Sequence, residues 1–185
     1  MDIQTLRTAC TDCQKCPLGR TRTNLVFGVG NPEADVLFIG EGPGEQEDLQ
    51  GEPFVGRSGQ LLDKMLACVD FSRKENIYIA NMVKCRPPQN RDPSPEEVNA
   101  CLPWLTAQVE AIRPKIIVCL GRVAAIRLIK PDFKVTREHG QFFRHNGILR
   151  MGTYHPAYLL RDPRNKPAAM EDLLRVRAQL EALTE

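Results

Sequence analysis

Long apolar runs are missing from this sequence. No stretch approaches the roughly 20 apolar residues that a membrane-spanning helix needs, and the N-terminal segment MDIQTLRTACTDC has no apolar signal core. We therefore expect a cytoplasmic protein with no membrane partner. Internal repeats, low-complexity runs and long linkers are absent as well, so the 185 residues predict a single domain over 1–185 with a sizeable core.

An excess of charge of one sign is also missing. The sequence has 25 Lys and Arg against 23 Asp and Glu, which leaves a net charge of +2 at pH 7. Such a balance neither requires nor excludes a nucleic acid as partner. Binding to a nucleic acid would have to rely on a local basic patch, because the total charge does not supply it.

A lysine is missing from the glycine-rich loop GEGPGEQED at residues 40–48, which follows the apolar run DVLFI. A P-loop needs G-x4-G-K-[ST] and a dinucleotide fingerprint needs G-x-G-x-x-G, and the loop has neither pattern. Its carboxylates, including those of Glu41, Glu47 and Asp48, would repel a phosphate but could orient a water molecule. The loop therefore favours a neutral planar ligand with hydrogen-bonding edges, such as a nucleobase.

Apolar runs alternate with helical patterns along the chain. We expect strands at 35–40, 76–81 and 115–121, and a hairpin of strands 141–145 and 148–154 around Asn146-Gly147. Helices are expected at 58–70, at about 95–112 behind the capping box Ser94-Pro95-Glu96-Glu97, at 122–129 and at 166–183. This alternation predicts an α/β fold, a three-layer α/β/α sandwich with a central, mainly parallel four-stranded sheet.

Candidate ligand-binding residues follow the ends of the expected strands. The loop at 40–48, the end of strand 76–81 and His155 should therefore converge on one site at the carboxyl edge of the sheet. Phe54 in GEPFVGRSG could stack on a base, although it also fits a core phenylalanine. The Asn81 amide could donate to uracil O4 and accept from N3–H, whereas cytosine presents the reverse pattern.

Plainer interpretations of these residues also exist. Asn81 fits a strand-end cap, and a lone histidine such as His155 is more often structural than functional. Positive charge near the loops comes from four side chains, each typical of a solvated surface residue when taken alone: Lys84, Arg86, Arg91 and Arg161.

Seven cysteines in a reducing compartment argue against disulfides and for metal binding, catalysis or burial. Cys68, on the apolar face of its helix, and Cys119, in a strand core, are expected to be buried small hydrophobes. A four-thiolate site is expected on the others, which suits either zinc or an iron–sulfur cluster. The C-x2-C-x2-C spacing at the N-terminus leaves Cys10 as a rival to Cys16; the expected ligands are Cys13, Cys16, Cys85 and Cys101.

Together these residues resemble the family 4 uracil-DNA glycosylases, the iron–sulfur class. The similarity covers nearly the whole chain and is carried, in order and at the family's spacing, by CQKCPLGRTRTNLVFGVGN, GEGPGEQED, GEPFVGRSGQLLDKML, NMVKCRPPQNRDPSPEEVNAC and HPAYLLR. The resemblance implies a structural [4Fe–4S] cluster on Cys13, Cys16, Cys85 and Cys101. It also implies a monomer that binds uracil-containing DNA, single- or double-stranded, and hydrolyses the uracil N1–C1′ bond without a lyase step.

The resemblance also implies roles for the site residues. Uracil would be flipped out of the stack, Phe54 would stack on it and Asn81 would read its Watson–Crick edge. The N–H of Gly42 and the ring of His155 would stabilise charge that develops on uracil O2. Glu41 would position the attacking water and stabilise the sugar cation, with Asn90 orienting it, and Glu47 would line the base pocket near uracil C5.

Two departures from related glycosylases bear on the mechanism. Gly42 stands where related families have aspartate or alanine, which favours electrostatic and leaving-group stabilisation over a single strong base. The segment NMVKCRPPQNRDPSP carries no inserted histidine-containing loop, which disfavours covalent capture of the DNA.

Two other classes of protein remain open at this point. The first is an iron–sulfur nucleic-acid-binding module without glycosylase activity, in which Phe54, Asn81 and His155 would be structural. It predicts no excision and tolerance of Asn81→Asp. The second is a zinc-stabilised nucleotide hydrolase, which an iron–sulfur absorbance near about 400 nm would count against.

Overall fold

The computed structural model describes all of residues 1–185. Four parallel strands form the centre of one sheet: β3 (Ile77–Asn81), β2 (Val36–Gly40), β4 (Ile116–Leu120) and β6 (Ile148–Thr153). Two short strands extend it at the edges, where β1 (Val29–Gly30) pairs antiparallel with β3 and β5 (Phe142–His145) pairs antiparallel with β6. The parallel centre confirms the expected sheet, but the strand count is six and not four, in the order β1-β3-β2-β4-β6-β5.

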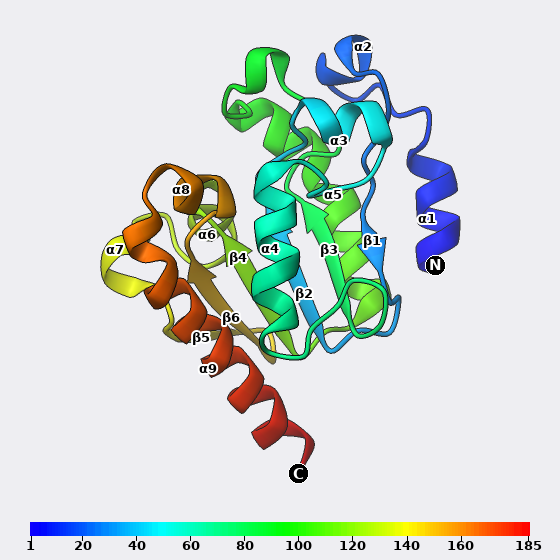
Figure 1. Cartoon of the computed structure of the whole chain (residues 1–185). Helices are drawn as coiled ribbons and strands as arrows, with labels where there is room; N and C mark the ends of the chain where they lie inside the picture. Colours follow the sequence, from blue (N-terminus) through cyan, green and yellow to red (C-terminus); the bar gives the residue numbers. More distant parts are fainter.

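Helices cover both faces of this sheet (Figure 1). One face packs against α1 (Ile3–Cys10), α5 (Pro95–Ile112) and α6 (Arg122–Leu128). The other face packs against α4 (Arg57–Ala67), α8 (Pro156–Arg161) and α9 (Lys166–Thr184). The shorter helices α2 (Leu18–Thr21), α3 (Glu45–Gln50) and α7 (Val135–Glu138) lie outside these layers. The fold is therefore the expected α/β/α sandwich.

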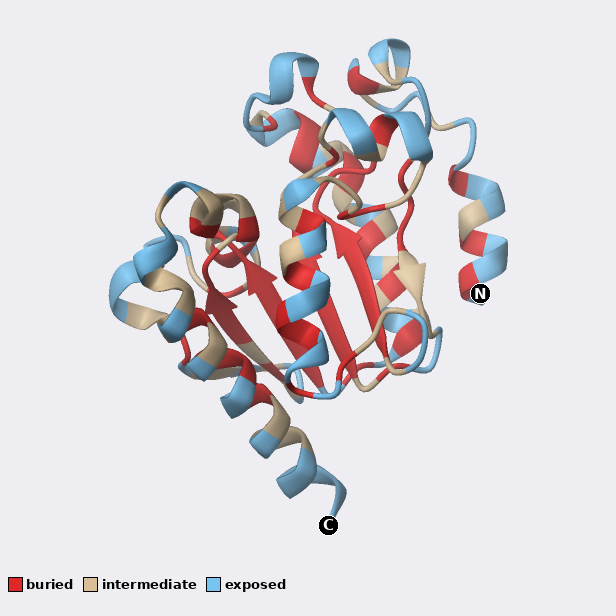
Figure 2. Ribbon diagram, viewed as in Figure 1, coloured by how far each residue is buried: buried red, intermediate tan, exposed pale blue.

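The core lies in two clusters, one on each face of the sheet. Along β2, Leu37 and Ile39 belong to the cluster under α1 and α5, whereas Val36 and Phe38 belong to the cluster under α4 and α9. This alternation follows from the two-residue period of a strand, and it explains why the central strands read as unbroken apolar runs. In Figure 2 these strands are almost wholly buried, while the outward faces of the helices are exposed.

The capping box predicted for α5 is present. Ser94 Oγ accepts from the Glu97 N–H at 3.2 Å, and the Glu97 carboxylate accepts from the Ser94 N–H at 2.8 Å. By contrast, α4 ends at Ala67, and Cys68 behind it is exposed, so its predicted burial is wrong. Cys119 is buried within β4, as expected. None of the helices combines the length and apolar character needed to cross a bilayer.

Candidate active site

A cavity of about 910 Å³ opens at the carboxyl ends of the parallel strands. Its wall includes every residue that the sequence predicted for catalysis or base binding: Glu41, Gly42, Glu47, Phe54, Asn81 and His155. Backbone hydrogen bonds just beyond the ends of the strands bring these segments together. The Met82 N–H donates to the Gly40 carbonyl at 2.9 Å, and the Gly121 N–H donates to the Thr153 carbonyl at 2.9 Å.

Asn81 and Phe54 meet at the floor of this cavity. Asn81 is 1% exposed, and its Oδ1 has no hydrogen-bond donor within the chain. A Cβ on Gly40 would lie 2.6 Å from both that Oδ1 and the Phe54 ring, so glycine is needed there. A buried acceptor without a donor is costly, so this oxygen is available to accept from a donor that enters the cavity.

His155 lies beside Phe54 with the ring centroids 5.6 Å apart. Its Nδ1 accepts the Ala157 N–H at 3.0 Å, because His155 is the N-cap of α8. Burial lowers the pKa of His155 to about 4, Arg161 acts in the same direction and Glu47 opposes them. The ring is therefore neutral near pH 7, and its proton resides on Nε2.

Glu41 shares its part of the cavity with Asp92 and Arg122. Burial, a hydrogen bond with Asp92 and the like charge of Asp92 together raise the pKa of Glu41 to about 7, while Arg122 acts in the opposite direction. Asp92 in turn accepts from Arg122 Nη2 at 2.9 Å. Asn90, predicted to orient Glu41, instead accepts from Arg86 Nε at 2.8 Å, so Asp92 is the neighbour that the prediction missed.

Two further acids of the loop, Glu47 and Asp48, are held by backbone N–H groups. The Glu47 carboxylate accepts from Gly44, Val55 and Gly56 at 3.1, 2.8 and 2.7 Å, which ties the start of α3 to the segment that carries Phe54. Asp48 is 4% exposed and accepts from the N–H groups of Thr23 and Asn24. Asp48 therefore anchors the N-terminal arm and orients no water in the cavity.

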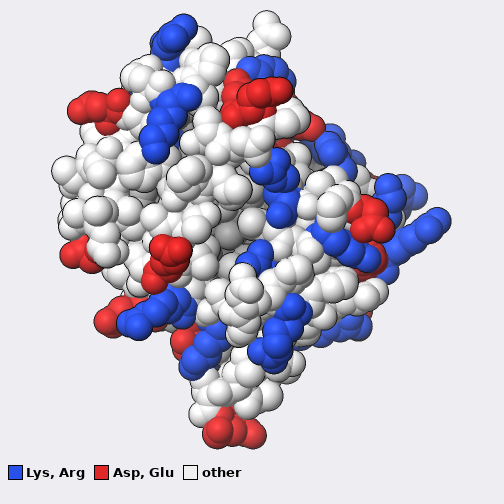
Figure 3. Space-filling model, turned by 180° about the vertical axis from the view of Figure 1, so that it is seen from behind, with Lys and Arg blue, Asp and Glu red and all other residues white.

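Basic side chains lie on several parts of the surface and are most numerous at one edge. In Figure 3, Lys and Arg side chains predominate along the right-hand edge, which is the edge that carries α7 in Figure 1. Five exposed basic residues line the cavity itself: Arg57, Arg91, Arg122, Lys134 and Arg161. Of the predicted basic residues, Arg91 pairs with Glu97 at 2.7 Å and Lys84 is buried, so Lys84 is not a solvated surface residue.

The cysteines predicted as ligands line a second, much smaller cavity of about 20 Å³. Cys13 and Cys16 come from the arm behind α1, Cys85 follows β3 and Cys101 lies on α5; Cys10 lines the same cavity. Two N–H donors reach sulfur atoms at 3.3 Å, Arg22 to Cys85 and Trp104 to Cys13. No three acidic, histidine or cysteine side chains of the chain converge as ligands of a single ion.

Lys84 lines the smaller cavity and hydrogen-bonds to Asn81, which lines the larger one. Its side chain is 1% exposed, and its Nζ donates to the Asn81 carbonyl at 2.8 Å. Burial lowers the pKa of Lys84 to about 8, while Cys101, Cys10 and Cys85 act to raise it. An ammonium group enclosed in this way indicates that negative charge belongs among the thiols.

A model of the uracil DNA glycosylase superfamily matches residues 27–176. A type-4 uracil-DNA glycosylase of Archaeoglobus fulgidus is 45% identical over 172 residues, which covers 89% of this chain and 86% of the relative. One of Thermotoga maritima is 46% identical over 156 residues, covering 83% and 81%, and one of Saccharolobus solfataricus is 44% identical over 176 residues, covering 91% and 82%. The chain belongs to the type-4 uracil-DNA glycosylases. This membership confirms the family and the fold class that the motifs predicted.

Several residues that shape the site of this type-4 glycosylase were not predicted from the sequence. Asp92 and Arg122 lie at the cavity wall beside Glu41, and Gly121 lies close enough to His155 that a Cβ there would be 2.9 Å from the His155 Cβ. Asp92 stands within the motif NRDPSP, but a motif does not show which neighbour its side chain meets. Only the path of the loop between β3 and α5 brings Asp92 to Glu41.

Proposed function

We propose that the protein removes uracil from DNA by hydrolysing the N1–C1′ glycosidic bond and leaves an abasic site. The observation that carries this proposal is the buried, unpartnered Oδ1 of Asn81 beside the Phe54 ring. Uracil N3–H would supply the missing donor, and the Asn81 amide N–H₂ would donate to uracil O4. Cytosine N3 would instead face Oδ1 with a lone pair, so the same site would reject it.

Phe54 would supply the stacking surface for the extruded base. A base must leave the duplex stack to reach this cavity, at a cost of a few kcal/mol, and stacking on an aromatic ring returns part of that cost. Both single- and double-stranded uracil-containing DNA could serve as substrate. Three of the basic residues at the cavity wall, Arg122, Lys134 and Arg161, would contact the phosphates.

His155 and Gly42 would stabilise the departing uracil. Neutral His155 has its proton on Nε2 and can donate to the charge that develops on uracil O2. The Gly42 N–H has no acceptor within the chain, and its cavity position allows a second donor bond to the same oxygen. Two fixed donors aimed at developing charge act most strongly on the transition state.

Glu41 would position the attacking water and stabilise the positive charge on the sugar. As a carboxylate it can accept from water and face the cation, whereas a hydrogen bond with Asp92 requires that Glu41 hold its proton. Glu47 lines the cavity, but its carboxylate is engaged by three N–H groups. We therefore assign Glu47 to shaping the wall of the base pocket and Glu41 to the chemistry.

The thiols of Cys13, Cys16, Cys85 and Cys101 would hold a [4Fe–4S] cluster. These four thiols come from separate segments and line one cavity, and four cysteine thiolates are a usual ligand set of such a cluster. The N–H groups of Arg22 and Trp104 at sulfur, and the buried Lys84, suit a negatively charged group. The cluster would hold the N-terminal arm against α5 and β3. We also propose that the enzyme is monomeric and cytoplasmic.

The proposal is tested with a labelled oligonucleotide that contains one uracil. After incubation with the purified protein and alkali treatment, we expect cleavage at the uracil and none in a matched thymine oligonucleotide. Without alkali the strand should stay intact, since no lyase step is proposed. Absence of cleavage from an iron-loaded preparation would contradict the proposal and favour a non-catalytic DNA-binding module.

A further inference from the structure

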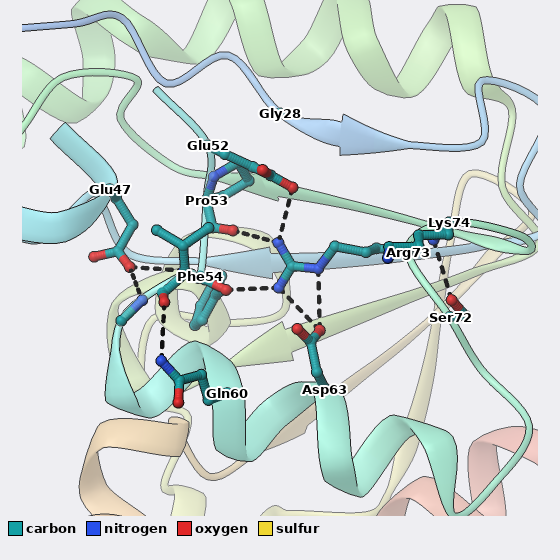
Figure 4. Close-up of polar contacts among 12 residues, drawn as sticks. Gly28, Glu47, Glu52, Pro53, Phe54, Gln60, Asp63, Ser72, Arg73 and Lys74 are labelled. Carbon is teal, nitrogen blue, oxygen red and sulfur yellow. Dashed lines mark hydrogen bonds and ion pairs between the residues drawn. The ribbon is translucent and has the colours of Figure 1, made fainter. Parts of the chain in front are cut away.

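Arg73 hydrogen-bonds to the backbone of the segment that carries Phe54 (Figure 4). In the sequence it stands between α4 and β3, and it does not line the cavity. Arg73 Nη1 donates to the Pro53 carbonyl at 2.6 Å, and Nη2 donates to the Phe54 carbonyl at 2.7 Å. The Arg73 side chain is 9% exposed. One guanidinium group therefore holds two consecutive carbonyls of the segment.

Two carboxylates fix the orientation of this guanidinium group. Asp63 on α4 accepts from Arg73 Nε at 3.0 Å, and Glu52 accepts from Nη1 at 3.4 Å. The planar fork of arginine can satisfy these acceptors and the two carbonyls together, which a lysine ammonium cannot do in the same geometry. The contact thus ties helix α4 to the segment at residues 52–54.

The peptide bond between Phe54 and Val55 is held at both ends. Its carbonyl accepts from Arg73, and its N–H donates to Glu47 at 2.8 Å. Phe54 has φ +53°, a left-handed conformation that is costly for a bulky side chain. Such a conformation persists only where the surroundings enforce it, and Arg73 and Glu47 are the charged groups that do so.

We propose that Arg73 is a positioning residue of the uracil site, which fixes the Phe54 ring for stacking without touching the substrate. This inference rests on the proposed uracil excision. It predicts that Arg73 affects the rate of excision only by fixing the position of the Phe54 ring. A merely structural arginine would lower stability but would not be coupled to Phe54 in this way.

A double-mutant cycle with Arg73→Gln and Phe54→Leu tests this claim. In the wild-type background, Arg73→Gln should lower kcat/KM for uracil-DNA by about 10-fold or more, since small misplacements of site groups cost that much. In the Phe54→Leu background the same change should cost less than about 3-fold. Equal losses in both backgrounds, or no loss in either, would overturn the inference.

Arg150→Gln is the matched control. Arg150 Nη1 also donates to a backbone carbonyl, that of Leu128 at 2.6 Å, and Arg150 does not line the large cavity. It should lower stability without changing kcat/KM. If Arg73→Gln fails to fold, Arg73→Lys replaces it in the same cycle, with a smaller loss expected and the same dependence on Phe54.

Amide hydrogen exchange gives a readout that does not depend on activity. In Arg73→Gln, the N–H groups of Val55 and Gly56 should exchange faster than in the wild type, because the peptide loses one of its two holders. Unchanged exchange would overturn the clamp itself. A wild-type protein that excises no uracil would instead overturn the proposed function, and the assignment of Arg73 to it.

Discussion

Three acids of the loop GEGPGEQED have different tasks, although they stand within eight residues of each other. Glu41 faces the cavity beside Asp92, Glu47 accepts from three backbone N–H groups, and Asp48 anchors the arm through Thr23 and Asn24. What separates them is the set of partners that folding brings to each carboxylate. Among these three, only Glu41 has no backbone N–H donor, which leaves its carboxylate available for chemistry.

Excision should rise with pH through about 7, because Glu41 must lose its proton to act and its pKa is raised to about 7. His155, with a pKa lowered to about 4, stays neutral throughout and adds no fall at higher pH. Single-turnover rates between about pH 5 and pH 9 would show this step, and Glu41→Gln should abolish it and lower the rate. A rate that falls as pH rises through 7 would contradict these roles.

The neighbours of Glu41 give the controls for this profile. Asp92→Asn removes a like charge, so the step should move to lower pH. Arg122→Gln removes a positive neighbour that lowers the Glu41 pKa, so the step should move to higher pH. A step that stays in place in both variants would mean that a group other than Glu41 titrates.

Asn81→Asp should exchange a uracil preference for activity on cytosine. An ionised aspartate cannot donate to uracil O4, which should cost about 1–3 kcal/mol, or roughly 10- to 100-fold in kcat/KM. Paired oligonucleotides with uracil or cytosine at one position would measure the ratio. Unchanged uracil excision would remove Asn81 from base recognition.

Residue identities were predictable from the sequence, but their partners were not. Asn81 and His155 line the cavity because strand ends in a parallel sheet meet at one edge, and Phe54 lines it from the segment between α3 and α4. The contacts that define their states come from distant segments. Asn90 was matched to Glu41 from its place in a motif, yet the loop turns its side chain to Arg86.

At the scale of elements, α4 is packed unusually close to the segment that carries Phe54. Gly59 makes this possible, because a Cβ there would lie 2.0 Å from both the carbonyl carbon and the oxygen of Phe54. The contact is with backbone, which cannot rotate away. The helix and the segment therefore behave as one unit, joined at Gly59 and again at Arg73.

Gly59→Ala should accordingly be destabilising, although alanine is the better helix former. We expect a loss of about 1–3 kcal/mol in the free energy of unfolding from the forced backbone shift, together with a marked loss of excision. Urea denaturation and excision assays would measure both. Lys64→Ala, at an exposed position of the same helix, should stay within about 0.5 kcal/mol of wild type. Equal behaviour of the two variants would refute the close contact.

The long elements, the hairpin at Asn146-Gly147 and helix α6 could be predicted from the sequence, whereas the short helices α2, α3, α7 and α8 could not. Buried strands and the capped helix α5 stand out through apolar runs and the Ser94 box. Helix α3 lies in a glycine-rich and acidic stretch, and the six-residue helix α8 begins at a proline. Neither helix shows apolar residues at helical spacing. The error at Cys68 arose because apolar spacing continues to Val69 although the helix ends at Ala67.

At the scale of the whole molecule, the N-terminal arm is held at its thiols and at Asp48. Alanine at any of the four proposed ligands, Cys13, Cys16, Cys85 or Cys101, should abolish iron binding and the absorbance near about 400 nm. Cys119→Ala and Cys10→Ala should retain both. Iron content per chain and limited trypsin cleavage after Arg20 or Arg22 would measure cluster loss and release of the arm. Iron loss in Cys10→Ala, with retention in Cys16→Ala, would reverse the ligand assignment.

Lys84 gives the cluster a consequence for iron supply. Its ammonium donates to the carbonyl of Asn81, the residue proposed to read uracil, and the thiols of Cys101, Cys10 and Cys85 act on its pKa. Without a negatively charged cluster, we expect this buried charge to move toward water and to loosen Asn81. A cell short of iron would then produce chains that fold around a poorly shaped base pocket. Under iron starvation, uracil would then remain unrepaired in the DNA of the cell even while the polypeptide itself is still being made.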